Sequence, residues 1–216
     1  MKKFELLISL SIIALLAGCA THRQNVSMET YTTDQKIYRN DFFKLTIKKP
    51  VTWYALSREH MEKMTQVGAD VLLGDNQSKK KIYDHSIRNS IPLFYFFQHP
   101  PGTPVNFNPS IGAVAESIEM APGIKTGCDY LYHARQLFNN TQLNLHMSET
   151  CDTMKLNRAT FGYADVTMRV NNQVIKQRYY TCIQGEYALS FFNSYSTYDE
   201  LRLLENLLKT IDVDCQ

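Results

Sequence analysis

The chain has 216 residues, of which 44% are hydrophobic and 20% are charged, and its formal net charge at pH 7 is +2. This length is sufficient for one domain that buries about 70% of the surface of its unfolded chain. Because nucleic-acid binding requires a concentrated basic surface, the near balance of charge argues against nucleic acid as a partner.

The first 18 residues are predicted to be a signal peptide. Lys2 and Lys3 precede an apolar segment of 12 residues, Leu6 to Ala17, which is too short for a spanning helix of about 20 residues. The run Leu16-Ala17-Gly18-Cys19 at its end resembles the lipobox of bacterial lipoproteins. The resemblance implies cleavage before Cys19 and acylation of this cysteine, so that acyl chains hold the protein on a membrane. An ordinary signal peptide with an incidental cysteine is the alternative.

Residues 19–37 are interpreted as the acylated cysteine and a polar tether, and residues 38–216 as a single globular domain. In the domain, Phe43, Leu45 and Ile47 alternate with polar residues, which predicts a half-buried strand that ends at Pro50.

A first helix is expected after Ser57, which is a suitable N-cap. Its apolar residues Met61, Met64 and Val67 share a face, and Gly68 can end it. Leu93 to Phe97 is a continuous apolar run, which predicts a strand covered on both faces.

Another strand is predicted over residues 111–120, followed by a helix over residues 129–138. Thr126 and Asp129, three residues apart, resemble a capping box at the start of that helix. The side chain of Glu116 is an exception on the apolar face of the strand.

The last third of the chain predicts an antiparallel meander over residues 164–170, 174–183 and 187–194. Thr197 to Glu200 is a capping box for a final helix, whose sheet-facing residues are Leu201, Leu204, Leu208 and Ile211. A sheet with helices on its faces is an α+β sandwich.

The order of these elements is similar to that of a known family. The matching features are the strand ending in Pro50 and Trp53, the turn Asn108-Pro109-Ser110, the helix beginning near Asp129, and the run Lys176-Gln177-Arg178-Tyr179-Tyr180. Over residues 38–213 they resemble the PsbP-like fold of DcrB-type bacterial lipoproteins. The resemblance implies an α/β/α sandwich with a mainly antiparallel sheet, used as a binding or assembly module without a shared catalytic site. The four cysteines and the Pro-rich turn at residues 99–104 depart from the pattern.

Lipidation of Cys19 leaves four cysteines, which allow three disulfide pairings. A helix after Cys128 and a strand that returns along it bring Cys151 close to Cys128. The last helix, running back along the third strand of the meander, brings Cys215 close to Cys182. We therefore predict these two disulfides, each contributing about 2 to 4 kcal/mol. A four-thiolate metal site is disfavoured because the chain has no C-x-x-C pair.

No nucleophile elbow, zinc-binding helix, phosphate loop or calcium loop is present in the sequence. The histidines considered as ligands are scattered; they are His85, His99, His133 and His146. Asp165 and Arg169 share a strand face, which favours an ion pair there over catalysis. We therefore expect no catalytic residue, no metal and no cofactor other than the lipid on Cys19.

The chain contains 13 tyrosines and 11 phenylalanines. Five tyrosines gather around one end of the predicted meander: Tyr179, Tyr180, Tyr187, Tyr195 and Tyr198. Because tyrosine is enriched in protein interfaces, they are a candidate protein-binding surface, with ordinary sheet packing as the alternative.

These observations together predict a lipid-anchored envelope protein whose domain binds another envelope protein and is not an enzyme. An aspartate directly after the acylated cysteine would resemble an inner-membrane retention signal of enteric bacteria. This chain has Ala20 there, which favours the outer membrane, facing the periplasm. The alternatives are a periplasmic small-ligand carrier or sensor with a cleft between sheet and helix, and an immunity protein against a secreted toxin. A hydrolase with a dispersed site is the last alternative.

Overall fold

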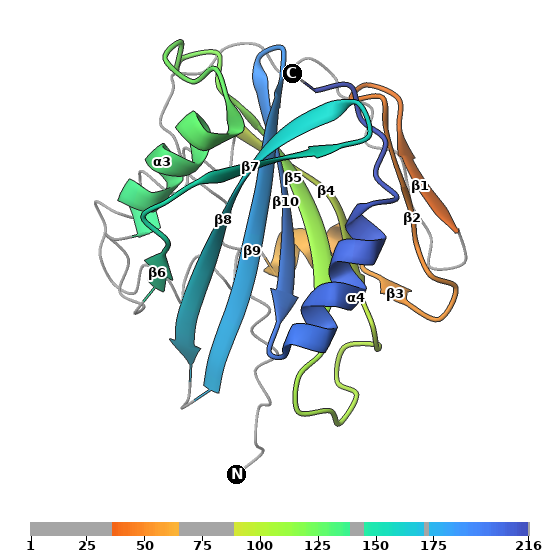
Figure 1. Cartoon of the computed structure of the whole chain (residues 1–216). Helices are drawn as coiled ribbons and strands as arrows, with labels where there is room; N and C mark the ends of the chain where they lie inside the picture. The colour runs from red at the N-terminus through yellow and green to blue at the C-terminus, as the bar shows by residue number, and fades with distance from the viewer. Residues whose placement is uncertain (1–35, 65–88, 139–144, 171–172, 216) are drawn as a thin grey trace.

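The computed structural model describes residues 36–64, 89–138, 145–170 and 173–215 (Figure 1). The predicted signal peptide, Cys19, nearly all of the tether and the predicted end of the first helix at Gly68 lie outside these ranges. Among the described residues, no helix is long and apolar enough to cross a membrane.

One eight-stranded sheet forms the centre of the domain, with the strand order β3-β4-β5-β10-β9-β8-β6 and with β7 also paired to β8. Every pairing in it is antiparallel. The strands are β3 (Tyr54–Ala55), β4 (Ser90–Phe97), β5 (Ser110–Ser117), β6 (Leu145–Met147), β7 (Asp152–Leu156), β8 (Ala159–Val170), β9 (Gln173–Gln184) and β10 (Tyr187–Tyr195). A separate hairpin pairs β1 (Ile37–Asn40) with β2 (Leu45–Lys48).

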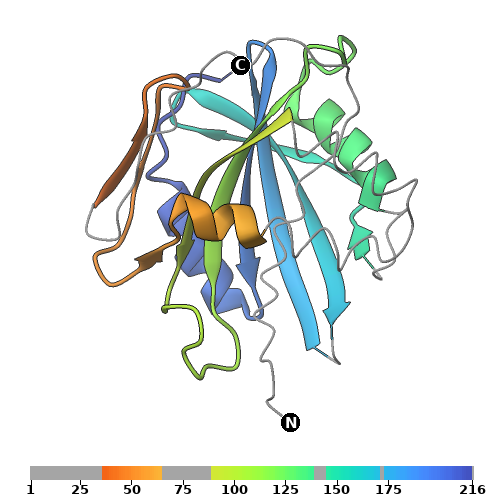
Figure 2. The ribbon, with the colours of Figure 1, turned by 180° about the vertical axis from the view of Figure 1, so that it is seen from behind.

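Two helices, α3 (Gly127–Phe138) and α4 (Tyr198–Leu208), lie within the described residues from end to end. They pack on opposite faces of the sheet. On the α3 side, Tyr130, Ala134 and Phe138 form one core with the short helix that begins at residue 58, seen from behind in Figure 2. On the α4 side, Leu201, Leu204 and Leu208 form a second core with the β1–β2 hairpin. The predicted α+β sandwich with a mainly antiparallel sheet is therefore confirmed.

Strand side chains alternate between the two cores, as a period of two requires. In β4, Tyr95 and Phe97 belong to the α3-side core, whereas Phe94 and Phe96 belong to the α4-side core, so this strand is covered on both faces as predicted.

Both helix starts follow the predicted capping chemistry. Thr197 caps α4 and forms a reciprocal capping box with Glu200. At the start of α3, the backbone N–H of Asp129 donates to Thr126 Oγ1 at 3.1 Å, and the Thr126 N–H donates to Asp129 Oδ2 at 2.8 Å. Residues near Ser57 also follow the prediction, because the His60 N–H donates to the Ser57 hydroxyl.

The four cysteines pair as predicted. Cys128 is bonded to Cys151 and Cys182 to Cys215, with Cα–Cα distances of 5.7 Å in both disulfides. The first fastens the start of α3 to the segment before β7, and the second fastens the chain after α4 to β9.

Candidate interaction site

Three neighbouring strands bring polar side chains into one row on the α4 side of the sheet. Asp165 on β8 lies opposite Arg178 on β9, and Arg178 lies opposite Asn193 on β10. Tyr180 and Phe191, two residues from Arg178 and Asn193, are buried in the α4-side core, and Tyr163, two residues before Asp165, packs against that core. An arginine at such a position requires carboxylate partners.

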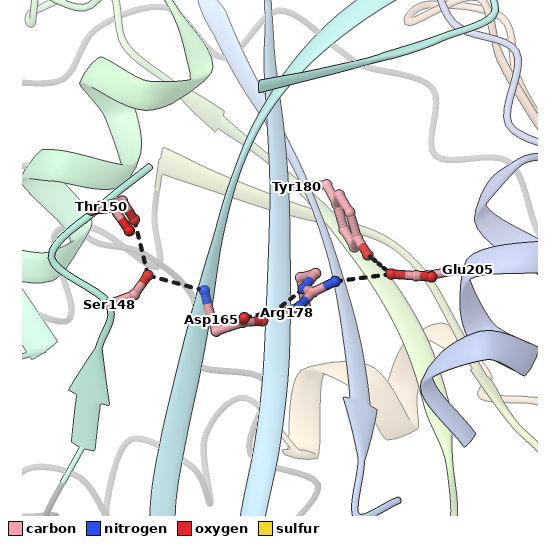
Figure 3. Close-up of polar contacts among 6 residues, drawn as sticks. All are labelled: Ser148, Thr150, Asp165, Arg178, Tyr180 and Glu205. Carbon is pink, nitrogen blue, oxygen red and sulfur yellow. Dashed lines mark hydrogen bonds and ion pairs between the residues drawn. The ribbon is translucent and has the colours of Figure 1, made fainter. Parts of the chain in front are cut away.

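Arg178 is held by two carboxylates from different elements (Figure 3). Its Nε and Nη2 atoms donate to the two oxygens of Asp165 at 2.6 and 2.9 Å. Its Nη1 atom donates to Glu205 Oε1 on α4 at 3.0 Å. The guanidinium carbon also lies 5.4 Å from the centre of the Tyr163 ring. The bidentate pair fixes the plane of the guanidinium, and Glu205 ties α4 to the sheet.

Two tyrosines complete the surroundings of this ion network. The Tyr180 hydroxyl donates to Glu205 Oε1 at 3.2 Å, and burial followed by the charge of Glu205 raises the pKa of Tyr180. Burial and then the Asp165 charge raise the pKa of Tyr195 to about 12. The hydrogen bonds with Asp165 raise the pKa of Arg178. At neutral pH Arg178 is therefore a permanent cation, and the phenols of Tyr180 and Tyr195 are protonated.

The backbone of Asp165 is fixed from the other side by Ser148. The Asp165 N–H donates to Ser148 Oγ at 3.2 Å, and the Ser148 hydroxyl donates to the Thr150 carbonyl at 3.0 Å (Figure 3). A continuous chain of hydrogen bonds thus runs from the segment after β6, across β8 and β9, to α4.

Asn193 is the third member of the row and is fully buried. Neither its side-chain nitrogen nor its side-chain oxygen has a hydrogen-bond partner. An unsatisfied buried polar group costs about 1 to 3 kcal/mol. Asn193 therefore lowers stability at this point of the sheet, as residues at functional sites often do.

The ion network is reachable from solvent. The exposed fractions of the side chains are 22% for Arg178, 45% for Asp165 and 32% for Glu205. Tyr198 lies seven residues before Glu205, on the same face of α4, and is 73% exposed. Arg202 lies between them on that face and is 65% exposed. We call these five residues the α4 patch.

The five tyrosines singled out in the sequence do not share one surface. Tyr179 is buried in the α3-side core, and Tyr187 lies at the other end of the sheet against the rings of Phe42 and Phe43. Tyr180 and Tyr195 are buried beside the ion network, and Tyr198 is exposed near it. Only the last three therefore belong to the neighbourhood of the α4 patch.

The ion pair expected for Asp165 has a different partner. Arg178 binds Asp165, whereas Arg169 is exposed near the end of β8 and lies opposite Val174. The sequence carried a signal for this pairing, because a two-residue turn at Asn171-Asn172 places residue 165 opposite residue 178. That turn itself lies outside the described residues.

Within the described ranges, no three His, Cys, Asp or Glu side chains lie close enough together to hold a metal ion. His99, His133 and His146 lie on separate elements or loops, and His85 is outside the described residues. The arrangement at the α4 patch is suited to recognition through charge and an exposed aromatic ring.

No protein-family model and no curated protein matches this chain. Several solved structures are similar to it, and among them are the following three. LpqN, involved in cell envelope biogenesis of Mycobacterium tuberculosis, is 13% identical over 78% of this chain and 80% of its own, with a TM-score of 0.39. Cyanobacterial PsbP (CyanoP) from Synechocystis sp. PCC 6803 is 9% identical over 91% of this chain and 98% of its own, with a TM-score of 0.49. A protein of Bacteroides thetaiotaomicron VPI-5482 is 10% identical over 78% of this chain and 44% of its own, with a TM-score of 0.41. At these values the matches carry no argument about function.

Proposed function

We propose that this chain is a lipid-anchored envelope protein that binds another envelope protein through the α4 patch and carries out no chemistry of its own. The lipobox run ending at Cys19 supports the anchor, and Ala20 supports the outer membrane, facing the periplasm. The membrane contact of this proposal is made by the acyl chains, and the protein contact by the folded domain.

The observation that carries the binding function is the ordered ion network beside an exposed tyrosine. Tyrosine and arginine are the residue types that dominate binding energy in protein interfaces. Arg178 is already held by Asp165 and Glu205, so little side-chain freedom is lost when a partner covers it. Tyr198 offers a large exposed ring with a polar tip on the same face of α4, two helical turns before Glu205.

The state of the reactive side chains also favours binding over catalysis. The four cysteines of the domain are in disulfides and offer no thiolate. Tyr180 and Tyr195 have raised pKa values, so both phenols stay protonated at neutral pH and cannot accept a proton as general bases.

The test is crosslinking of the acylated protein in intact cells, followed by purification in detergent and mass spectrometry of what remains bound. We expect one envelope protein in stoichiometric amount, and at least about a tenfold loss of its crosslink in the Y198A/R202A variant. The control is Tyr132→Ala. It removes a tyrosine that is 54% exposed on α3, the helix on the opposite face of the sheet. Equal loss in both variants, or no partner at all, would contradict the proposal.

A small-ligand carrier is the second candidate, and the buried Asn193 favours it, because its unpaired amide could bind a polar group. In the same purification, this function predicts a small molecule or lipid in place of a protein. Its amount would fall in the Asn193→Leu variant and stay unchanged in Y198A/R202A.

A further inference from the structure

We infer that the outer face of the β1–β2 hairpin docks on anionic lipid headgroups of the leaflet that holds the acyl chains. This inference rests on the acyl anchor of the proposed function. It adds a second contact with the membrane, made by the folded domain itself.

The hairpin separates apolar and basic side chains onto two faces. Its inner face carries Tyr38, Leu45 and Ile47, which are at most 2% exposed in the α4-side core. The outer face and its ends carry four exposed basic residues, which are Lys36, Arg39, Lys44 and Lys48. The register explains the separation, because Arg39 lies opposite Thr46, and Lys48 lies opposite Ile37.

The outer face also has the apolar groups that a membrane interface accepts. Ile37 on this face is 51% exposed, and Phe42 in the adjoining turn is 43% exposed, with its ring packed against Phe43 and Tyr187. Asp41 is the one carboxylate within the described residues 36–49. A basic surface with isolated apolar side chains is complementary to anionic headgroups, whereas the α4 patch contains more carboxylates near its centre.

Hydrogen bonds to other segments hold the hairpin in place on the domain. Thr46 exchanges backbone hydrogen bonds with Asp212 at 2.8 and 2.9 Å, and the Lys49 ammonium donates to the carbonyls of Pro50 and Trp53. In Figures 1 and 2 the hairpin forms an outer edge of the domain, with its far side away from the sheet. A docked hairpin would therefore orient the whole domain.

The position of the hairpin in the chain argues for a lipid surface as the occupant. Sixteen residues separate Cys19 from Lys36. Even fully extended, they span at most about 55 Å, so an acylated Cys19 keeps Lys36 within that distance of the membrane surface. Tethering makes this contact intramolecular and raises its effective concentration.

The experiment uses the acylated protein reconstituted into vesicles of phosphatidylcholine, with or without phosphatidylglycerol. Lysines are acetylated with an amine-reactive reagent, and the rate at each lysine is read by mass spectrometry. We expect Lys36, Lys44 and Lys48 to react more slowly on the anionic vesicles, and high salt to remove this protection. The exposed Lys155 and Lys176 lie on other strands and serve as internal controls.

The variant K44Q/K48Q measures the contribution of the basic face. Each basic side chain near an anionic surface contributes about fivefold, so the ratio of docked to undocked protein, read at Lys36, should fall about 25-fold. The matched control K155Q/K176Q removes the same charge elsewhere and should leave the ratio unchanged. Equal labelling on both vesicles, protection of Lys155 and Lys176 instead, or protection that requires added envelope proteins would overturn the inference.

The anchor is measured separately in the same samples. The mass of the peptide that begins at Cys19 shows whether it is acylated, and an acyl anchor keeps the protein on vesicles at high salt. If Cys19 carries no lipid, the anchor of the proposed function is wrong. Salt-sensitive flotation that depends on Lys44 and Lys48 would still support the hairpin contact.

Discussion

The two faces of the sheet carry the same kinds of parts and use them differently. Each face has a helix, a disulfide and a carboxylate bonded to a tyrosine. On the α3 side, Glu116 is fully buried and accepts a 2.6 Å hydrogen bond from Tyr130. On the α4 side, Glu205 is partly exposed and binds Arg178 as well as Tyr180. The carboxylate on the first face is therefore shielded from solvent, whereas the one on the second is partly open to it.

The close packing of α3 gives the largest expected effect. A Cβ atom on Gly127 would lie 1.9 Å from the carbonyl oxygen of Thr181, so Gly127→Ala must push α3 off the sheet. We expect the free energy of unfolding to fall by at least about 3 kcal/mol. Urea unfolding followed by the fluorescence of Trp53 measures it.

The control for this variant lies four residues earlier. A Cβ atom on Gly123 meets nothing within 4 Å, so Gly123→Ala should change stability by less than about 0.5 kcal/mol. If Gly127→Ala lowered the free energy of unfolding by as little as this, α3 would be able to shift on the sheet without cost, and its close packing would not contribute to stability.

The two disulfides should contribute equally to the free energy of unfolding, one on each face of the sheet. The pairs close loops of similar length, with sequence separations of 23 and 33. We therefore expect C128S/C151S and C182S/C215S each to lower the free energy of unfolding by about 3 kcal/mol, because loop-closure entropy depends weakly on length. Thermal or urea unfolding of the two double variants tests this, and a difference of more than about 2 kcal/mol would count against it.

The hydroxyl groups of Tyr130 and Tyr180 give the sharpest comparison. Tyr130→Phe removes a short bond to a buried carboxylate and should cost about 2 kcal/mol of unfolding free energy. Tyr180→Phe removes a 3.2 Å bond to a partly exposed carboxylate and should cost less than about 1 kcal/mol. Urea unfolding at neutral pH measures both, and the opposite order would refute the assignment of Glu116 to the fold.

Alkaline pH tests the α4 side by titration. The pKa of Tyr195 is raised to about 12, whereas a tyrosine in an unfolded chain has a pKa of about 10. Because the folded state holds the proton more tightly, this contribution to stability is complete below about pH 10 and is lost as the pH rises toward about 12. Unfolding measured across this range should show a shallower fall in the Tyr195→Phe variant, and identical pH profiles would argue against the raised pKa.

Local patterns predicted the parts of the fold in which neighbouring residues decide the structure. Alternation identified β8, β9 and β10, and the pair Thr197 and Glu200 identified the start of α4. The strand β7 was not predicted, because its residues are mostly exposed and only Met154 and Leu156 alternate with polar residues, which is too short a run to identify a strand. Likewise, β3 is only two residues long, too short to show any period.

The candidate site was only partly predictable, because it depends on contacts between distant residues. The turn after β8 is enough to place Asp165 opposite Arg178, but it does not indicate that Glu205 on α4 completes the network. The tyrosines were grouped because they gather around one end of the predicted meander, although adjacent Tyr179 and Tyr180 point into opposite cores. Alternation along β9 was the signal that separates them.

The borders of the sheet have a consequence for contacts between copies of this domain. Among the described residues, the sheet is bordered by β3, with two residues, on one side and by β6 and β7, with three and five, on the other. Neighbouring copies can join their sheets edge to edge when long, flat end strands leave rows of backbone groups unpaired. Border strands as short as these offer few such groups in register. Copies of this domain therefore have little tendency to polymerise through their sheets.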